Sequence, residues 1–505
     1  MLKNQISRDA GKNRPTRVLA ASLIATFLFA TYLRLSYITY GLPYLYNGDE
    51  MINFRIIQSM LARRSLDPEF FNYPSLLFYL NLPGQVLFRN ISGELVPIVS
   101  QSMGNGYAPQ PAALLVARLV TVAFGVATVA ASWRMARNVG LRLPFVLLAA
   151  IMVSSTPLLV RQSSFVTPDM IASFFTTATL AAAVSITRRT DWRIYVLAGI
   201  LAGLAAATKY NAGLVGLAIP VAHFAGQRLQ RAAPLIALAA ASAIVALFAA
   251  SPYLALNSTR AIDGFLFELQ HYRNGHPGAE GDSFRTNARW LFNQTGWTFL
   301  FLSGLAFASA RWRALAPVAF FTFTYFFLLS AQFVRFERNL LPMLPAFFVL
   351  LAAGAQQVAK MLPLRSLNPV IVGLFLAAAI AGPIGKSVRD LGDYDRDPRA
   401  HVRQWLEAQT SHAKKIAVDA YSPFLMVDPG TQVIGKYSVL SLPLKDLLGM
   451  DHVVLRMANV RRVLDAGDAP QIEVLKELSG RACETAEYPA PPARPQWKVF
   501  KLNCP

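Results

Sequence analysis

The sequence predicts a polytopic α-helical membrane protein that ends in a small α/β domain. First, hydrophobic residues make up 54% of the 505-residue chain and charged residues only 15%, which is unusually apolar for a soluble protein of this length. Second, apolar runs of about 20 residues, the length that crosses a bilayer, recur between residues 18 and 388. Third, hydrophobicity falls after residue 388, where short strand-like and helix-like segments follow.

About eleven apolar runs are candidate transmembrane helices. Residues 1–17 form a basic start ahead of the first run, and this run has no small-residue cleavage site, so we expect a retained anchor. The two short runs on either side of residues 208–211 predict a tight hairpin of tilted or incomplete spans. The runs are centred near residues 28, 123, 151, 178, 200, 217, 243, 303, 325, 349 and 378.

Basic residues in the short connections predict the orientation. Lys and Arg gather in residues 1–17 and in alternate connections after that, which is typical of cytoplasmic loops. We therefore expect a multi-pass protein of the inner (plasma) membrane, with a transmembrane domain at 18–388 and a cytoplasmic N-terminus. A long first loop at 41–111 and the C-terminal domain at 389–505 would then be extracytoplasmic. The net charge of +20 does not indicate nucleic-acid binding, because the basic residues are scattered between apolar runs.

The C-terminal domain shows alternating strand and helix patterns. Segments Lys415–Asp419 and His452–Arg456 are typical of short strands, while residues 398–408 and 469–478 are typical of helices. Cys483 and Cys504 are the two cysteines of the chain, so a cysteine metal site is excluded. They form either a disulfide or a pair of free thiols.

An acidic pair, Asp49 and Glu50, follows the first span within the first loop. The pattern of residues 51–64 predicts an amphipathic helix lying at the membrane interface, with Ile52 on its apolar side. In one interpretation Asp49 only caps this helix and Glu50 is a favourable first-turn charge. In the other, the helix start holds an ionised Asp49 ready to accept a proton from an incoming hydroxyl.

Further motifs recur in a characteristic order. They are Tyr73-Pro74-Ser75 opening a second loop helix, Ala117-Arg118-Leu119 in the second span, Thr167-Pro168-Asp169 opening the fourth, a small-residue run that ends at Lys209, and residues 335–345. With Asp49 and Glu50, this order resembles the protein O-mannosyltransferase and lipid A aminoarabinose transferase superfamily, glycosyltransferase family 39, over residues 15–390. Members of that family often carry His-Pro-Pro or Lys-Pro-Pro where this chain has Tyr73-Pro74-Ser75.

The resemblance implies a GT-C fold and an activity. The chain would transfer a sugar from a polyprenyl-phosphate donor to a hydroxyl of a lipid, glycan or protein acceptor on the extracytoplasmic side, with inversion. Asp49 would be the general base, Asp169 a second acid at the same face, and Glu50 a further catalytic candidate. No cofactor is required, although some relatives bind a divalent metal near the acid pair.

Cationic residues are the candidates for binding the lipid phosphate. Arginine suits this task because its planar donor fork matches phosphate oxygens, and an ionisable residue within a span is costly without a function. The candidates are Arg335 and Arg338, followed by Lys209 and Arg118, with Tyr73 as an additional substrate contact. The alternatives are snorkelling to the interface for Arg335, Arg338 and Lys209, and an internal ion pair for Arg118.

Two other interpretations remain. His271 and His276, with Glu268, Glu280 and Asp282 nearby, lack diagnostic metal-ligand spacing, so we interpret residues 257–294 as a solvated loop.

The main competing function is a transporter or flippase of lipid-linked sugar, and a lipid-linked glycan ligase or an inactive family member is also open. Transporters usually carry acids near the midplane of the bilayer, whereas Asp49 and Asp169 are predicted at the outer surface. This placement favours chemistry there.

Overall fold

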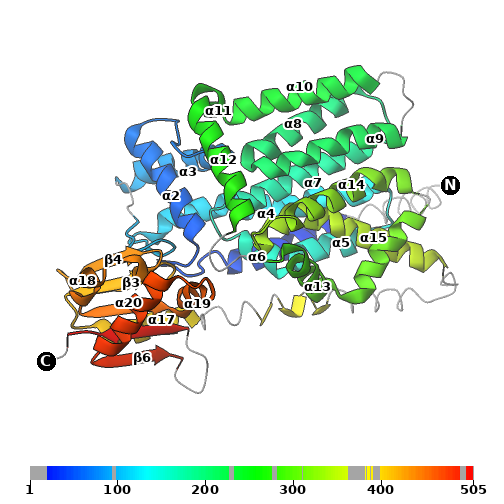
Figure 1. Cartoon of the computed structure of the whole chain (residues 1–505). Helices are drawn as coiled ribbons and strands as arrows, with labels where there is room; N and C mark the ends of the chain where they lie inside the picture. Colours follow the sequence, from blue (N-terminus) through cyan, green and yellow to red (C-terminus); the bar gives the residue numbers. More distant parts are fainter. Residues whose placement is uncertain are drawn as a thin grey trace, which may run out of the picture.

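The computed structural model shows a helical bundle with a smaller domain at one end (Figure 1). It describes residues 20–93, 98–226, 232–275, 281–309, 311–361, 381–382, 384–386, 388–389, 398–489 and 496–503. Outside these ranges lie residues 1–17, His276, Glu280 and Cys504. Most of the predicted run near residue 378 also lies outside them. The prediction of a membrane bundle followed by a small α/β domain is confirmed.

The bundle is built from apolar helices of spanning length. Within the described residues, five helical segments are long and apolar enough to cross a membrane. They are α4 (Pro111–Val139), α7 (Pro168–Ile186), α10 (Ala232–Ala250), α14 (Trp312–Ser330), and Glu337–Met361, which comprises η3 (Glu337–Met343) and α15 (Leu344–Met361). Shorter apolar helices are Ala20–Ser36, α5 (Leu143–Ser155) and α8 (Trp192–Thr208). All of these coincide with predicted runs.

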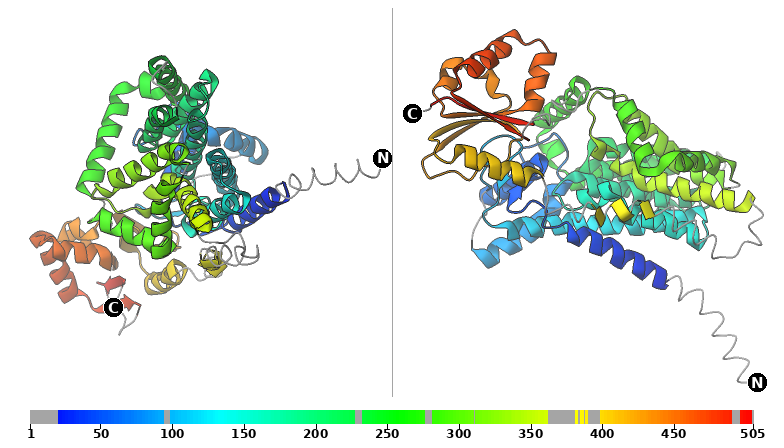
Figure 2. Two further views of the ribbon diagram at one scale, coloured as in Figure 1. Left: turned by 90° about the vertical axis from the view of Figure 1, so that its right-hand side faces the viewer. Right: turned by 90° about the horizontal axis from the view of Figure 1, so that it is seen from below.

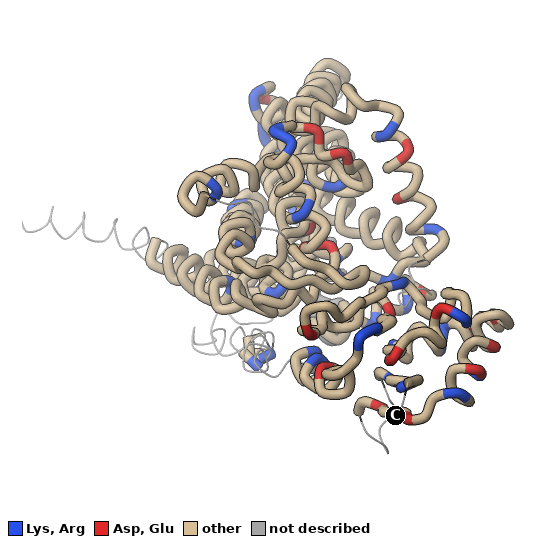
Figure 3. Tube along the Cα trace, turned by 90° about the vertical axis from the view of Figure 1, so that its left-hand side faces the viewer, with Lys and Arg blue, Asp and Glu red and all other residues tan. Residues whose placement is uncertain are grey.

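The predicted hairpin near residues 208–211 takes an irregular form. Helix α8 ends at Thr208, and η1 (Tyr210–Leu217) folds back against it before α9 (Ala218–Gly226) begins. Helix α7 lies at the centre of the bundle and is buried along most of its length, whereas α10 is mostly exposed along its apolar surface. Charged residues are sparse along the bundle helices and more frequent in the loops and the smaller domain (Figure 3).

The first loop is folded and packed. Strand β1 (Tyr44–Leu45) pairs antiparallel with β2 (Gly106–Tyr107). The segment of the chain that connects these two strands contains α2 (Gly48–Arg63) and α3 (Leu76–Ser92). The predicted apolar side of α2 was partly wrong, because Ile52 is 38% exposed while Glu50 and Asn53 are fully buried. A helix lying at the membrane interface would bury only its apolar side chains. This helix instead packs against other parts of the protein, where its buried polar side chains find hydrogen-bond partners.

The predicted solvated loop at residues 257–294 is largely helical. Helices α11 (Tyr253–Leu256), α12 (Ser258–Asn274) and α13 (Ser283–Leu305) occupy it. Helix α12 runs beside the first loop, where Gly264 packs so closely on the backbone of Phe71 that a Cβ would lie 2.6 Å from its carbonyl carbon. The remaining bundle elements are α6 (Pro157–Gln162) and η2 (Ala306–Ala308).

The C-terminal domain, called the tail domain below, is a five-stranded sheet with helices. The strand order is β4-β3-β5-β7-β6, with β4, β3 and β5 parallel and β7 and β6 antiparallel. The strands are β3 (Lys415–Asp419), β4 (Gln432–Lys436), β5 (His452–Arg456), β6 (Glu484–Tyr488) and β7 (Trp497–Lys501), and the helices are α17 (Pro398–Thr410), η5 (Val439–Ser441), α18 (Leu444–Leu448), α19 (Met457–Asp465) and α20 (Ala469–Arg481). The two predicted strands and two predicted helices are confirmed.

The tail domain is joined to the first loop by specific contacts (Figure 2). The side chain of Gln101 exchanges two hydrogen bonds with the backbone of Leu425, at 2.6 and 2.8 Å, and the backbone N–H of Tyr421 donates to the carbonyl of Met103 at 2.8 Å. The guanidinium of Arg403 lies 4.1 Å from the ring centroid of Tyr44. These contacts hold the tail domain beside the start of α2.

Candidate active site

A cavity of about 420 Å³ opens where the first loop, α12, the tail domain and the starts of α7 and η3 meet. Five residues predicted from the sequence line it, namely Asp49, Tyr73, Asp169, Lys209 and Arg338. These residues are far apart in the chain, and the packing of the bundle against the first loop brings them together.

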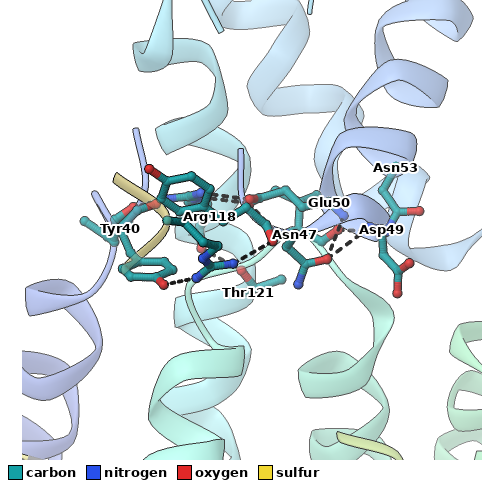
Figure 4. A network of polar contacts seen from close by, with 11 residues as sticks. Tyr40, Asn47, Asp49, Glu50, Asn53, Arg118 and Thr121 are labelled. Carbon is teal, nitrogen blue, oxygen red and sulfur yellow. Dashed lines mark hydrogen bonds and ion pairs between the residues drawn. The ribbon is translucent and has the colours of Figure 1, made fainter. Parts of the chain in front are cut away.

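Asn47, one residue before α2, is the N-cap of this helix. Its side-chain oxygen accepts hydrogen bonds from the backbone N–H groups of Asp49 at 3.0 Å and Glu50 at 3.3 Å. The interpretation of Asp49 as a mere helix cap is therefore wrong. With the capping position filled, the carboxylate of Asp49 turns away from the Glu50–Arg118 pair (Figure 4) and binds Nη2 of Arg338 at 2.7 Å.

Glu50 and Arg118 form a buried ion pair, as the alternative interpretation of Arg118 foresaw. The two guanidinium nitrogens Nε and Nη2 donate to the two carboxylate oxygens at 2.8 and 2.7 Å, and neither side chain is more than 1% exposed. Glu50 also accepts from the backbone N–H of Val166 at 3.1 Å, and Arg118 donates to the carbonyls of Ile38 and Tyr40. The network joins α2, α4, the turn after the first helix and the segment before α7 (Figure 4).

Neither Glu50 nor Arg118 is among the residues that line the cavity. Four of the five N–H donors of Arg118 are directed to Glu50 and two backbone carbonyls, and the side chain is buried away from the cavity. The geometry therefore favours a structural role for this pair over the expected contacts with substrate.

Asp169 and Lys209 form a second acid–base pair in the cavity. Lys209 Nζ lies 2.9 Å from a carboxylate oxygen of Asp169 and 2.9 Å from the side-chain oxygen of Asn339, which also accepts a hydrogen bond from the hydroxyl of Tyr272 at 3.1 Å. Burial lowers the pKa of Lys209, but the Asp169 carboxylate outweighs this effect and raises the pKa above its ordinary value. Lys209 is therefore a permanent cation beside Asp169.

Arg338 and Arg335 lie in different environments. Arg338 belongs to η3 and packs its guanidinium 4.6 Å from the ring centroid of Phe336 while binding Asp49. Arg335 is exposed and does not line the cavity, so the structure does not bring it together with the other predicted cations. The chain is extended at Phe336 before the 3-10 helix begins at Glu337, so residues 335 and 338 do not share a face.

Tyr73 lies in the cavity wall with its hydroxyl fixed. The hydroxyl donates to the side-chain oxygen of Asn53, whose amide group donates to the carbonyl of Val166 at 2.8 Å. Burial, reinforced by the nearby Asp49 carboxylate, raises the pKa of Tyr73 well above its ordinary value. The side chain is therefore a neutral phenol that contacts the cavity through its ring and hydroxyl.

The lining residues that were not predicted as site residues include the polar side chains of Glu268, His271, Asn339 and Tyr421. Glu268 and His271 lie on one face of α12, so the interpretation of this segment as a solvated loop was wrong for both. Burial raises the pKa of Glu268, although the Lys209 cation acts in the opposite direction, and burial lowers the pKa of His271, although the Asp49 carboxylate acts in the opposite direction. Their helical spacing of three residues was the sequence signal that could have placed them together.

The possible metal site has no support from geometry in the part of the chain that the structure covers. Among those residues, no group of three or more His, Cys, Asp or Glu side chains is placed to hold a metal ion. Asp282 instead caps α13 by accepting a hydrogen bond from the backbone N–H of Arg285 at 2.8 Å.

Comparison with known proteins points to one fold. The family model described as dolichyl-phosphate-mannose-protein mannosyltransferase matches residues 91–251. No curated protein sequence matches the chain. The structure of ArnT from Cupriavidus metallidurans bound to undecaprenyl phosphate is 14% identical, covers 97% of this chain and 98% of that chain, and has a TM-score of 0.54. Its apo state gives 15% identity over the same shares, with the same TM-score of 0.54.

A more distant match is the S. cerevisiae protein O-mannosyltransferase Pmt1-Pmt2 complex bound to the sugar donor. It is 16% identical and covers 53% of this chain and 36% of that chain, with a TM-score of 0.34. The family match and the architecture shared with ArnT along almost the whole chain confirm the resemblance drawn from the sequence. This chain is a polytopic membrane protein with the GT-C fold seen in ArnT, and its residues 91–251 resemble the dolichyl-phosphate-mannose-protein mannosyltransferase family.

Proposed function

We propose that this protein transfers a hexosyl or pentosyl group from a polyprenyl-phosphate-linked donor to an acceptor hydroxyl at the extracytoplasmic face, with Asp49 as general base. The observation that carries the proposal is the cavity in which two carboxylates, Asp49 and Asp169, each lie beside a cation, Arg338 and Lys209. Carboxylates and cations in one cavity are the groups that such a transfer needs, because a proton must be accepted while a phosphate leaves.

The donor would place its phosphate on Arg338 and Lys209. Both cations lie close to Asn339. Lys209 donates a hydrogen bond to the side chain of Asn339, and Arg338 is the residue before Asn339 in η3. Arg338 offers a planar fork that matches phosphate oxygens, and Lys209 adds a point charge. The ArnT structure holds undecaprenyl phosphate, which supports a donor of this chemical class.

The chemical step would be an in-line displacement. The acceptor oxygen forms a bond to the anomeric carbon as its proton passes to the Asp49 carboxylate, and the bond from that carbon to the phosphate oxygen breaks. The electron pair of the broken bond stays on the polyprenyl phosphate, whose negative charge Arg338 and Lys209 offset. Attack from the side opposite the leaving group inverts the anomeric configuration. A phosphate that engages Arg338 would also release Asp49 from its present ion pair.

The extracytoplasmic placement of the cavity belongs to the same proposal. The first loop and the tail domain both line the cavity, and the basic connections lie at the opposite ends of α4 and α7. The transporter or flippase alternative places its ionisable groups near the middle of the bundle, whereas these acids lie at helix starts.

The test is sugar transfer by the purified protein from a panel of radiolabelled polyprenyl-phosphate sugars, offered with lipid A, a Ser/Thr-rich peptide and a glycan as acceptors. The wild type should use one donor, and Asp49→Asn should lower its turnover by at least about 100-fold, the usual contribution of a general base. The matched control is Glu69→Gln, which removes an exposed carboxylate of the same loop that pairs with Arg63 at 2.9 Å.

Three outcomes separate the alternatives. Loss of turnover in Asp49→Asn alone supports the proposal. Equal turnover in Asp49→Asn and wild type would exclude Asp49 as the base and turn attention to Asp169. If the wild type consumed no donor with any acceptor, the transporter alternative would become the better explanation.

A further inference from the structure

A second cavity of about 610 Å³ lies between α4, α7 and α8, away from the active site. On α4 it is lined from Ala127 to Asn138, whereas Arg118, which belongs to the network behind Asp49, lies near the start of this helix. The sixteen residues from Arg118 to Arg134 span about 24 Å of helix. The second cavity is therefore at the opposite end of the bundle and is separate from the site described above.

One part of this cavity is an apolar wall of small side chains. Alanines from α4 and α7 form most of it, and Phe174, Ile194, Leu197 and Leu201 complete it. Leu197 is 51% exposed, so the groove opens onto the lipid-facing surface of the bundle. Alanine leaves space where a larger side chain would fill the contact between helices, so a hydrocarbon chain can lie against this wall.

The other part of the cavity is basic. Arg134, Arg188 and Arg189 line it, and all three are exposed and form no ion pair with any described residue. Asn138 lies beside them, with its amide group donating to the carbonyl of Ala181 at 2.7 Å and the hydroxyl of Ser185 at 3.0 Å.

The positive charge extends beyond the three lining arginines. A Cβ built on Gly140 would lie 3.2 Å from Arg188 Nη2 and 3.2 Å from Arg311 Nε, so two guanidinium groups meet at this glycine. The nearest acid in the sequence, Asp191, accepts a hydrogen bond from the backbone N–H of Arg193 and caps α8. No ion pair joins Asp191 to the three arginines among the described residues, so the like charges repel one another, and an anion bound between them reduces that repulsion.

We propose that this groove binds one anionic phospholipid of the leaflet opposite the active site. The phosphate would rest on Arg134, Arg188 and Arg189, and an acyl chain would lie along the alanine wall. The combination of features selects this occupant. A free inorganic anion would bind the arginines but leave the apolar wall uncovered. A zwitterionic lipid could cover the wall but carries no net negative charge to attract the arginines. Basic grooves between transmembrane helices on the cytoplasmic side are suited to such headgroups.

Native mass spectrometry of the full chain in detergent tests the proposal. Phosphatidylglycerol, phosphatidylcholine and undecaprenyl phosphate are offered separately at equal concentration. The wild type should retain one phosphatidylglycerol in preference to phosphatidylcholine. The triple variant Arg134→Gln, Arg188→Gln, Arg189→Gln should bind it at least about tenfold more weakly. A control triple variant, Arg260→Gln, Arg273→Gln, Arg285→Gln, makes the same charge change at exposed positions of α12 and α13 and should bind like the wild type.

A fourth variant, Ala130→Phe, fills the apolar wall without changing any charge and should also lose the lipid. Equal loss in both triple variants would show a general charge effect and overturn the proposal. Undecaprenyl phosphate should bind at the active site in every variant, and its loss in the Arg134, Arg188 and Arg189 triple variant but not in the control triple variant would overturn the choice of phospholipid. Unchanged binding by Ala130→Phe would overturn the placement of the acyl chain. None of these readouts depends on sugar transfer, so the proposal can fail or stand apart from the proposed enzyme activity.

Discussion

At the residue scale, the two acid pairs near the start of α2 have different physical roles. The Asp49 side chain is 42% exposed and its partner Arg338 is 25% exposed, so this pair can open to a ligand at little cost. Glu50 and Arg118 are almost fully buried and share a two-point contact. A buried pair of this kind resists separation, because each charge would be left without its partner in an apolar surrounding.

Replacing Glu50 by Gln should therefore destabilise the protein and not only inactivate it. The unpaired Arg118 guanidinium would remain buried, and breaking a buried pair in this way costs about 3–5 kcal/mol. Thermal unfolding in detergent should show a clear fall in Tm, with Glu69→Gln unchanged. Normal Tm with abolished sugar transfer would contradict the structural role and return Glu50 to the catalytic group.

Arg338 should control donor binding through the shape of its side chain as well as its charge. Arg338→Lys keeps the charge but loses the planar fork, so the KM for the polyprenyl-phosphate sugar should rise at least about tenfold. Arg338→Gln should raise it further. Arg335→Gln removes a nearby exposed arginine that does not line the cavity and should leave KM unchanged. Equal effects of the changes at positions 335 and 338 would contradict the assignment of the phosphate site.

At the element scale, the end of β3 contains a buried acid that couples three segments of the tail domain. The two carboxylate oxygens of Asp419 accept hydrogen bonds from the backbone N–H groups of Val439 and Arg456, both at 2.8 Å. Burial raises the pKa of Asp419 to about 6, although these hydrogen bonds act in the opposite direction. An unfolded Asp titrates near pH 4.

The stability of the tail domain should therefore fall as the pH rises from about 4 to about 6. In this range the folded Asp419 keeps a proton that the unfolded chain has released, so its stabilising contribution is present below pH 4 and is lost above pH 6. The shift corresponds to about 3 kcal/mol. Thermal unfolding followed across this range should show a smaller pH dependence in Asp419→Asn than in wild type. Identical pH profiles would contradict the raised pKa.

At the scale of the whole molecule, the tail domain completes the active-site cavity. Tyr421, a tail residue in the left-handed region at φ +62°, lines the cavity beside Gly48 and Gly104 of the first loop. Gly104 has φ +82°, and a Cβ there would lie 2.2 Å from the Tyr421 ring. The domain and the loop therefore fit together only because position 104 has no side chain.

Gly104→Ala should displace the tail domain from the cavity and lower sugar transfer by at least about tenfold, since misplacing a wall of the site disturbs substrate positioning. Gly93→Ala is a matched control. Gly93 also has a positive φ, of +77°, and lies in the same loop, but a Cβ there would meet nothing within 4 Å. Both changes carry the same backbone cost, and only Gly104→Ala adds the clash. Equal activity of the two variants would contradict the role of this junction.

The amino-acid sequence by itself determined the features that depend on local pattern. Hydropathy identified the apolar helices, short apolar runs identified β3 and β5, and the motif order identified the superfamily resemblance. The family resemblance placed Asp49 and Asp169 in one site, and Lys209 became a candidate because an ionisable residue at the end of a span is costly without a function. These signals are short-range, so they can be read along the chain.

Only the tertiary structure decided which charges meet. Glu50 follows Asp49 directly in the sequence, yet one turns inward to Arg118 and the other into the cavity, because the Asn47 cap sets the direction in which α2 begins. Arg335 lies outside the cavity, while Glu268 and Tyr421 lie inside it. Contacts such as that between Gly104 and Tyr421 join residues hundreds of positions apart. Such contacts depend on how whole elements pack, which no local periodicity records.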